Sequence, residues 1–151
     1  MKALSVKQPW AALLVEGLKT IEVRSQPTKH RGRLLICASK VPKDVFWLDP
    51  VDKVHRLLHA GCMIGIVDVI DCRPLLKKDA AAALAPFQAG AWAWVVKPVT
   101  YVRPDPIVGR LGLFDVADSL ARPIANDDTD WVFNYPCPQG EIAFTDRCPV
   151  I

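Results

Sequence analysis

The chain has 151 residues, 51% of them hydrophobic and 23% charged, which is the size and composition of one globular domain spanning residues 1–151. Its apolar runs are too short to cross a bilayer and its first residues resemble a strand rather than a signal peptide, so we expect no membrane contact and a cytoplasmic location. The net charge of +3 is too mild to predict nucleic-acid binding by itself.

The first part of the chain predicts a strand, a helix and a second strand. Lys2–Val6 has strand composition, and Pro9–Glu16 begins with a proline suited to the first helical turn. Gly17 can adopt the left-handed conformation that ends a helix. Thr20–Arg24 then alternates with a period of two, which predicts a strand with its aliphatic side chains towards the core.

Lys19, Thr20, Glu22 and Arg24 are expected to meet where this helix passes into the strand. A guanidinium offers forked donors to a phosphate or a base edge, and a carboxylate can accept from an exocyclic amine or act as a general base. These four residues therefore form the central candidate site for a polar, planar ligand. The alternative is a solvated strand face, because exposed charges are commonly only loosely paired.

Flanking residues are expected to converge on the same cleft. The additional binding candidates are Gln8, Trp10, Lys29, Arg31, Arg33, Ser39 and Lys40. Between Lys19 and Lys40 there are six cations and one acid, Glu22, so one side of the domain should be electropositive. Such a surface favours a phosphodiester or a nucleotide with modest, salt-sensitive affinity.

The middle of the chain predicts a buried strand and a helical segment. Arg33–Ala38 is almost continuously apolar, which is typical of a central strand covered on both faces. Pro42–Leu58 is expected to be helical, with an interruption at Pro50. No chemistry is assigned to this segment.

Met63–Ile70 is the clearest strand of the sequence, and Gly65 within it predicts a bulge or a close backbone approach. Asp68 interrupts its apolar run. We expect this carboxylate either to face the cleft or to pair with a cation such as Lys19 or Arg24, and both outcomes would place it near the site.

Two further elements complete the predicted barrel. Lys77–Ala85 has helical composition, and Ala91–Tyr101 is a strand with Trp92 and Trp94 on one face. Core packing is favoured over base stacking for these tryptophans, since a small barrel needs large side chains to fill it. Gly109–Val116 supplies a last short strand.

The five cysteines and three histidines predict no metal site and no cofactor. The cysteines have no paired short spacing and are interpreted as reduced thiols, with Cys37 and Cys72 in or beside apolar strands. His55 and His59 are four residues apart on the expected helix, but no third ligand lies nearby in the sequence.

The chain resembles the ASCH (activating signal cointegrator homology) domain family, which belongs to the PUA-like superfamily. Blocks that carry the resemblance occur in the family's order: Ser5–Trp10, Gly17–Arg24, Arg31–Ile36, Ala38–Lys40, Gly65–Val69, Trp94–Val96 and Gly112–Phe114. They cover about residues 4–116 and leave a C-terminal extension, 117–151, with two further short strands expected at Trp131–Phe133 and Glu141–Phe144.

The resemblance implies an α+β fold, a small PUA-like β-barrel of mostly antiparallel strands with flanking helices. It also implies a cleft that handles RNA, DNA or a nucleoside, and we expect a nucleic-acid-binding module for RNA in the first place or for a modified nucleotide. A protein-interaction adaptor is suggested by the larger co-regulators that carry this domain, but a polar, charged cleft does not indicate a protein partner.

A metal-independent hydrolase is the alternative function. Some similar proteins remove the acyl group from N4-acetylcytidine with a lysine, a threonine three residues later and a glutamate further on, and others resemble ribonucleases that use a lysine, a tyrosine and a serine. Lys19 matches the lysine, but Glu22 stands at the threonine position. If the chain is an enzyme, we expect Lys19, Glu22 and Asp68 to be its catalytic residues.

Overall fold

The computed structural model describes residues 1–43, 45–48 and 55–124. Its elements are β1 (Lys2–Val6), α1 (Trp10–Glu16), β2 (Ile21–Arg24), β3 (Gly32–Ala38), β4 (Phe46–Leu48), β5 (His55–Leu57), β6 (Cys62–Pro74), η1 (Lys77–Asp79), α2 (Ala80–Ala83), β7 (Trp92–Tyr101), β8 (Leu113–Asp115) and η2 (Asp118–Leu120), where η denotes a 3-10 helix. Among these residues, no helix is both long and apolar enough to span a membrane.

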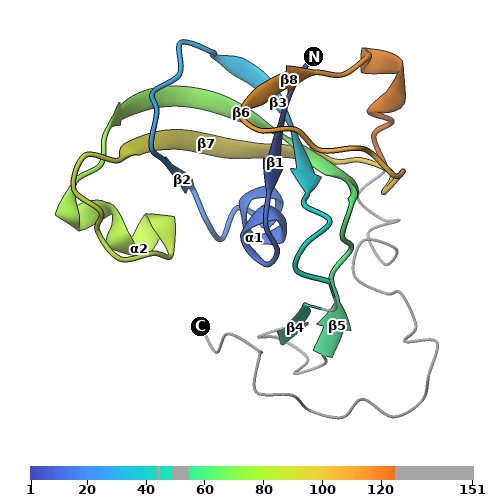
Figure 1. Ribbon diagram of the computed structural model, residues 1–151, viewed down its shortest axis with the longest axis horizontal. Coiled ribbons are helices and arrows are strands. Elements are labelled where there is room, and N and C mark those ends of the chain that lie inside the picture. Colours follow the sequence, from blue (N-terminus) through green and yellow to red (C-terminus); the bar gives the residue numbers. More distant parts are fainter. Residues whose placement is uncertain (44, 49–54, 125–151) are drawn as a thin grey trace.

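Six strands form one curled, mixed sheet in the order β2-β7-β6-β3-β1-β8. β1 and β3 pair in parallel, and the other neighbours in this sheet are antiparallel. The sheet curves into a half-barrel, with α1 at its centre and α2 beside β2 (Figure 1). The predicted α+β class with mostly antiparallel strands and flanking helices is confirmed.

Helix α1 covers one face of the sheet because its apolar side chains pack directly on the strands. Leu14 and Val15 join the largest buried cluster, which also contains Trp94 of β7. A Cβ added at Gly65 of β6 would lie 2.3 Å from Cγ1 of Val15, so only glycine lets the helix approach this closely. The predicted close approach at Gly65 is confirmed, as is the core position of Trp94, which is 5% exposed.

The turn from α1 into β2 follows the predicted route. Gly17 ends the helix with a φ of 78°, in the left-handed region, and its backbone N–H bonds to the carbonyl of Leu14. β2 then pairs antiparallel with β7, which places Glu22 opposite Trp94 and Arg24 opposite Trp92. Residues opposite each other in a sheet share a face, so the two charged side chains of β2 lie on the face that α1 covers.

The predicted helix between Pro42 and Leu58 is wrong in the described parts of that segment. Phe46–Leu48 and His55–Leu57 are instead strands β4 and β5, which pair antiparallel as a separate small sheet. Phe46 and Trp47 of β4 are residue types that favour strands, and both strands have three residues, which is too short to show a period in the sequence. The strands expected at 131–133 and 141–144 lie outside the described residues.

Candidate functional site

Lys19 is one of the most deeply buried side chains of the protein, although it carries an ammonium group. It is 2% exposed, and its Nζ donates a 2.5 Å hydrogen bond to the carbonyl of Ala83 at the end of α2. Its backbone N–H bonds to the carbonyl of Leu13, which fixes the residue directly after the helix end. A buried ammonium is stable only with such partners, so α1 and α2 together determine where this charge lies.

Glu22 lies between two cations. Its Oε2 is 3.6 Å from Nζ of Lys19, its Oε1 is 3.7 Å from a terminal nitrogen of Arg24, and the residue is 8% exposed. Burial lowers the pKa of the Lys19 ammonium and raises the pKa of the Glu22 carboxyl. The attraction between the two groups opposes both pKa shifts. This attraction offsets part of the free-energy cost of removing the two charges from water.

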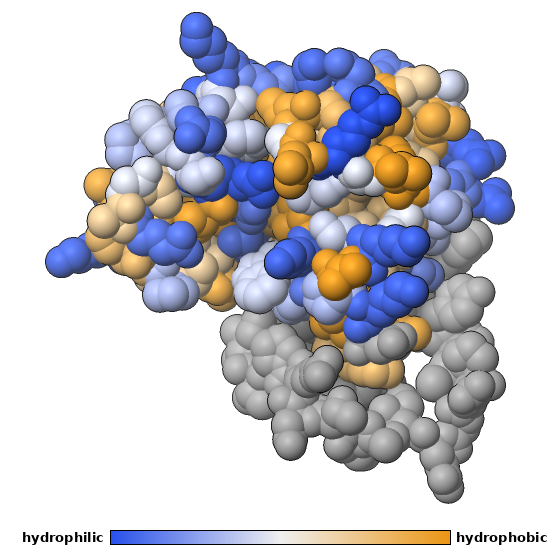
Figure 2. Space-filling model, viewed as in Figure 1, coloured by the Kyte–Doolittle hydropathy of each residue, from blue (hydrophilic) through white to orange (hydrophobic). Residues whose placement is uncertain are grey.

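This cluster lines a pocket with a volume of about 520 Å³, which we call the site pocket. β1 and its following residues, β2, the loop after α2 and the loop before β8 form its walls. Figure 2 shows hydrophilic residues in the indentation between the part that carries α2 and the centre of this face. Charged and aromatic side chains in its lining are Lys7, Trp10, Lys19, Glu22, Arg24 and Arg110.

The site pocket is electropositive. Glu22 is its only carboxylate among the described lining residues, and four cations line it. Lys7 and Arg110 make no ion pair with any residue in the described ranges. Their charges therefore remain available to an anionic ligand, whereas Lys19 and Arg24 are already paired with Glu22.

Five of the predicted binding residues line the site pocket. They are Trp10, Lys19, Glu22, Arg24 and Ser39. Trp10 is 38% exposed, so part of its indole surface is open to a ligand instead of buried in the core. Lys40 lines an adjoining hollow rather than the site pocket itself.

Gln8 and Thr20 lie near the site pocket without lining it. Gln8 is 2% exposed, and its amide group is used twice, donating to the carbonyl of His59 and accepting from the N–H of Ala12. The backbone of Thr20 bonds to Ala82 and Val96. Both residues hold α1, β2 and α2 in place around the cluster.

The basic turn formed by Lys29, Arg31 and Arg33 does not reach the site pocket. Arg33 is the second residue of β3 and Ser39 follows its end, so the turn and the pocket are separated by about 20 Å at roughly 3.3 Å per residue. Arg31 lies 3.6 Å from a carboxylate oxygen of Asp71 on β6. The basic turn and Lys40, although close in sequence, therefore lie at opposite ends of β3.

Asp68 belongs to the turn rather than to the pocket. It faces Arg33 across the β3–β6 pair, and its carboxylate lies 3.4 Å from Nε of that arginine. The expected pairing of Asp68 with a cation is found, but the cation is Arg33 and not Lys19 or Arg24, because the β3–β6 register places Arg33 opposite Asp68. The expectation that Asp68 lies near the site is therefore wrong. Of the three residues predicted to be catalytic, only Lys19 and Glu22 are brought together.

Sequence reasoning missed Lys7 and Arg110. Lys7 was overlooked because it falls between a strand and a helix, although it belongs to the Ser5–Trp10 block. Arg110 comes from the loop between β7 and β8, which returns to the pocket because β8 pairs with β1. The sequence marks this loop by its prolines and by the two glycines that flank Arg110–Leu111. These residues do not indicate which part of the domain the loop contacts.

Across the parts of the chain that the structure describes, no group of three or more His, Cys, Asp and Glu side chains is arranged to hold a metal ion. The described cysteines, Cys37, Cys62 and Cys72, are free thiols. Burial raises the pKa of both Cys37 and Cys62 to about 12, so these thiols stay protonated and unreactive in the core.

Comparison with known proteins gives matches to one family. A model of the ASCH domain matches residues 4–104. Activating signal cointegrator 1 from Homo sapiens is 42% identical over 80 residues, and the same-named protein from Mus musculus is 41% identical over 80 residues. Each match covers 46% of this chain and 14% of the relative, so the chain corresponds to a small part of those proteins.

The fold also matches a solved structure. The crystal structure of ASCH from Zymomonas mobilis superimposes with a TM-score of 0.57 and 17% sequence identity, covering 78% of this chain and 88% of that one. At this identity the match shows the fold alone, a PUA-like half-barrel.

Proposed function

The chain belongs to the ASCH domain family, and we propose that its site pocket binds RNA, or a modified nucleotide of RNA, through phosphate contacts and base stacking. The observation that carries this proposal is the charge of the pocket: four cations and one carboxylate line about 520 Å³. Two of those cations have no described carboxylate partner, which leaves them free to neutralise phosphates.

Each kind of group in the pocket has a distinct role in the proposed complex. Lys7 and Arg110 contact phosphate oxygens, as an ammonium and a forked guanidinium do in other nucleic-acid complexes. Trp10 offers an exposed indole face on which a base can stack. Glu22 and Arg24 present an acceptor and donors side by side, which suits the edge of a base that carries both kinds of group.

The experiment is a titration of a fluorescently labelled single-stranded RNA oligomer with the protein at several salt concentrations. Wild type, Lys7→Ala and Lys97→Ala are compared, because Lys97 is an exposed lysine of β7 that lines neither hollow. We expect affinity to fall with salt, Lys7→Ala to weaken binding several-fold, and Lys97→Ala to bind like wild type. A DNA oligomer of the same sequence tests the preference for RNA.

Equal weakening by Lys7→Ala and Lys97→Ala would contradict the proposal, because it would mean that any surface lysine contributes equally. Absence of RNA binding at low salt would also contradict it. Capture of a protein partner without any nucleic acid would favour the adaptor function instead.

A hydrolase acting in the same pocket is the second candidate, and the burial of the Lys19–Glu22 pair favours it. A carboxyl whose pKa is raised by burial is suited to general base catalysis near neutral pH. In hydrolysis of an acylated nucleoside, Glu22 would take a proton from water as the water oxygen adds to the acyl carbonyl. Lys19 would stabilise the oxyanion, and the proton would pass to the amine as the C–N bond breaks.

The hydrolase candidate is tested with N4-acetylcytidine and with RNA oligomers, measuring released cytidine or shortened RNA by chromatography. We expect turnover in wild type and in Lys97→Ala, and loss of turnover in Glu22→Gln. The wild-type rate should rise with pH through a range above that of an ordinary glutamate, because the base form is needed. Binding of RNA by wild type without any turnover would exclude this candidate and leave the binding function.

A further inference from the structure

A second hollow adjoins the site pocket. It has a volume of about 1010 Å³, and we call it the side groove. The two hollows share four lining residues, Ser5, Ser39, Arg110 and Leu111, so they are parts of one continuous depression. Each is as large as a typical small-molecule site, which spans roughly 300–1,000 Å³.

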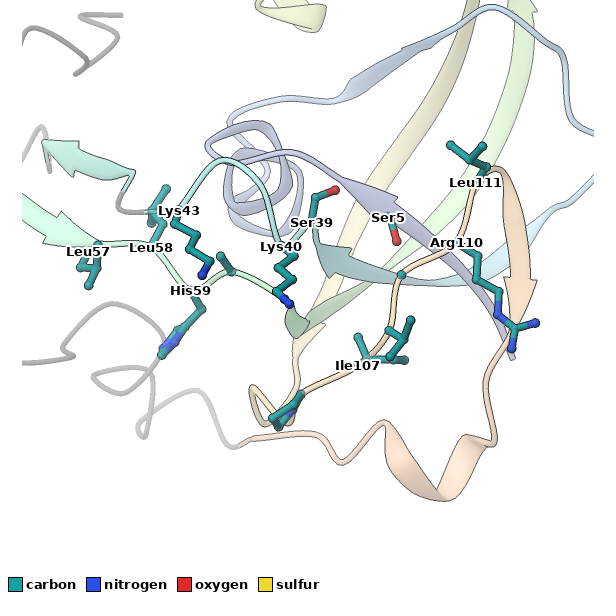
Figure 3. Close-up of a pocket in the computed structure, with 15 residues that line it drawn as sticks. Ser5, Ser39, Lys40, Lys43, Leu57, Leu58, His59, Ile107, Arg110 and Leu111 are labelled. Atoms are coloured by element: carbon teal, nitrogen blue, oxygen red, sulfur yellow. The ribbon is translucent and has the colours of Figure 1, made fainter.

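The side groove is also electropositive. Lys40, Lys43 and Arg110 line it, and it contains no aspartate or glutamate among its described lining residues. Neither lysine forms an ion pair with a residue in the described ranges. Figure 3 shows Lys40 and Lys43 on the segment that follows β3, and Ile107, Arg110 and Leu111 on the loop before β8.

The loop side of the groove adds apolar surface beside these charges. Val108 is 85% exposed and Leu111 is 101% exposed, so the loop presents two aliphatic side chains to solvent. Ile107 is held in place by a backbone hydrogen bond to the carbonyl of Gly61. A lysine pair facing an apolar wall suits a ligand with regularly spaced negative charges and flat apolar faces, which describes a nucleic-acid strand.

The loop meets β1 at the junction of the two hollows. A Cβ at Gly109 would lie 2.3 Å from Oγ of Ser5, so the loop backbone packs directly against this serine. Oγ of Ser5 is buried and has no hydrogen-bond partner within the described part of the chain. This unpartnered hydroxyl therefore packs against Gly109, the residue that precedes Arg110 in the loop.

We propose that the ligand is a single-stranded oligonucleotide that crosses from the site pocket into the side groove, and not an isolated nucleoside. One nucleotide occupies the site pocket beside Trp10, and the following nucleotides occupy the side groove with their phosphates near Lys40 and Lys43. Arg110 contacts the backbone at the junction. This inference rests on the function proposed above, and it adds the length of the ligand and the direction in which it leaves the pocket.

The test compares binding of oligouridylates of one, two, three, four, six and eight nucleotides to the whole chain. Three proteins are measured: wild type, Lys40→Ala/Lys43→Ala, and Lys77→Ala/Lys78→Ala. The last is a matched control that removes two exposed lysines from η1, which line neither hollow. Thermal unfolding of each variant verifies that it is folded.

For wild type we expect affinity to rise at least tenfold from one nucleotide to four and then to level off. Lys40→Ala/Lys43→Ala should bind the mononucleotide like wild type and lose most of the gain with length. Its salt dependence for the longer oligomers should be shallower by about 1.4 in log K against log salt, because each phosphate contact on a single strand contributes about 0.7. The control should match wild type at every length.

Three results would overturn the inference. Binding that does not depend on length would mean that the site pocket alone holds the ligand, and the proposed function would stand. A length dependence that Lys40→Ala/Lys43→Ala leaves intact would place the additional nucleotides elsewhere. Binding of an acidic peptide such as oligoglutamate in the side groove, with no RNA binding at any length, would overturn both this inference and the proposed function.

Discussion

The site pocket and the basic turn contain similar charges but use them differently. In the turn, Arg31 and Arg33 lie 3.6 Å and 3.4 Å from aspartates of β6. In the pocket, Lys7 and Arg110 have no carboxylate partner in the described ranges. Arg31 and Arg33 of the turn are therefore paired with carboxylates of the sheet, whereas Lys7 and Arg110 of the pocket are available to a ligand.

The comparison shows that sequence proximity does not determine which cations act together. Antiparallel pairing of β3 with β6 sets Arg33 opposite Asp68. Pairing of β8 with β1, more than a hundred residues apart in sequence, brings Arg110 to the pocket. Strand register therefore decides where the electropositive surface lies, and the predictions below test this difference from the largest expected effect to the smallest.

The largest effect should come from Lys19→Met. Removing the ammonium leaves the Glu22 carboxylate buried with one cation partner in the described ranges, Arg24 at 3.7 Å, and breaking a buried ion pair costs about 3–5 kcal/mol. Urea unfolding at neutral pH measures this loss. The double variant Lys19→Met/Glu22→Gln should recover part of it, because no isolated charge remains.

Arg33→Ala is the matching variant in the basic turn, and its stability is measured by the same urea unfolding as that of Lys19→Met. Its ion pair with Asp68 is largely exposed, and exposed pairs contribute about 0–1 kcal/mol. A loss of stability in Arg33→Ala as large as that in Lys19→Met would contradict the distinction between the two regions.

Trp10→Ala should produce the next largest effect, and it should appear in binding rather than in stability. Stacking of one base on an aromatic side chain is worth about 1–3 kcal/mol, so RNA affinity should fall by roughly 5- to 150-fold. Trp10→Phe keeps an aromatic face and should retain most of the affinity. Quenching of indole fluorescence by RNA in wild type, and its reduction in Trp10→Phe, identifies the contact; equal affinity of Trp10→Ala and wild type would exclude it.

Asp79→Asn should produce a smaller effect, a change in how the stability of the fold depends on pH in the acidic range. Arg73 binds both carboxylate oxygens of Asp79 at 2.6 and 2.8 Å, and this pairing lowers the pKa of Asp79 from 3.8 to about 2. A depressed carboxyl pKa stabilises the folded state above about pH 4 and loses that contribution as pH falls towards 2.

Thermal unfolding between pH 7 and pH 2 measures this contribution. Asp79→Asn should unfold at a lower temperature than wild type at pH 7, and the difference should shrink as the pH approaches 2. A difference that stays constant over this range would mean that the Arg73–Asp79 pair does not support η1 and α2, which carry the carbonyl that receives Lys19.

Much of the fold could be predicted from the sequence, because the strands and α1 have clear periodicity. Gly17 and Gly65 were identified for the physical reasons that the structure bears out, a left-handed helix end and a close helix contact. β4 and β5 could not be predicted, since each has three residues and the segment around them has helical composition.

The candidate site could be predicted only where its residues are close in sequence. Lys19 and Glu22 are three residues apart around a helix end, so local geometry sufficed to bring them together. Arg110 and the partner of Asp68 depend on which strands pair, and one sequence does not contain that information. Burial of Lys19 also could not be foreseen, because it depends on the carbonyl of Ala83 from a distant helix.

The salt dependence of RNA binding tests the central claim most directly, with Lys7→Ala/Arg110→Ala compared with Arg31→Ala/Arg33→Ala. Both double variants remove two positive charges, one pair from the site pocket and the other from the basic turn. The slope of log K against log salt should become shallower by about 1.4 in the pocket variant, since each lost phosphate contact removes about 0.7, and should not change in the turn variant. An unchanged slope in the pocket variant, with the shallower slope in the turn variant, would show that RNA binds at the basic turn and would contradict the account.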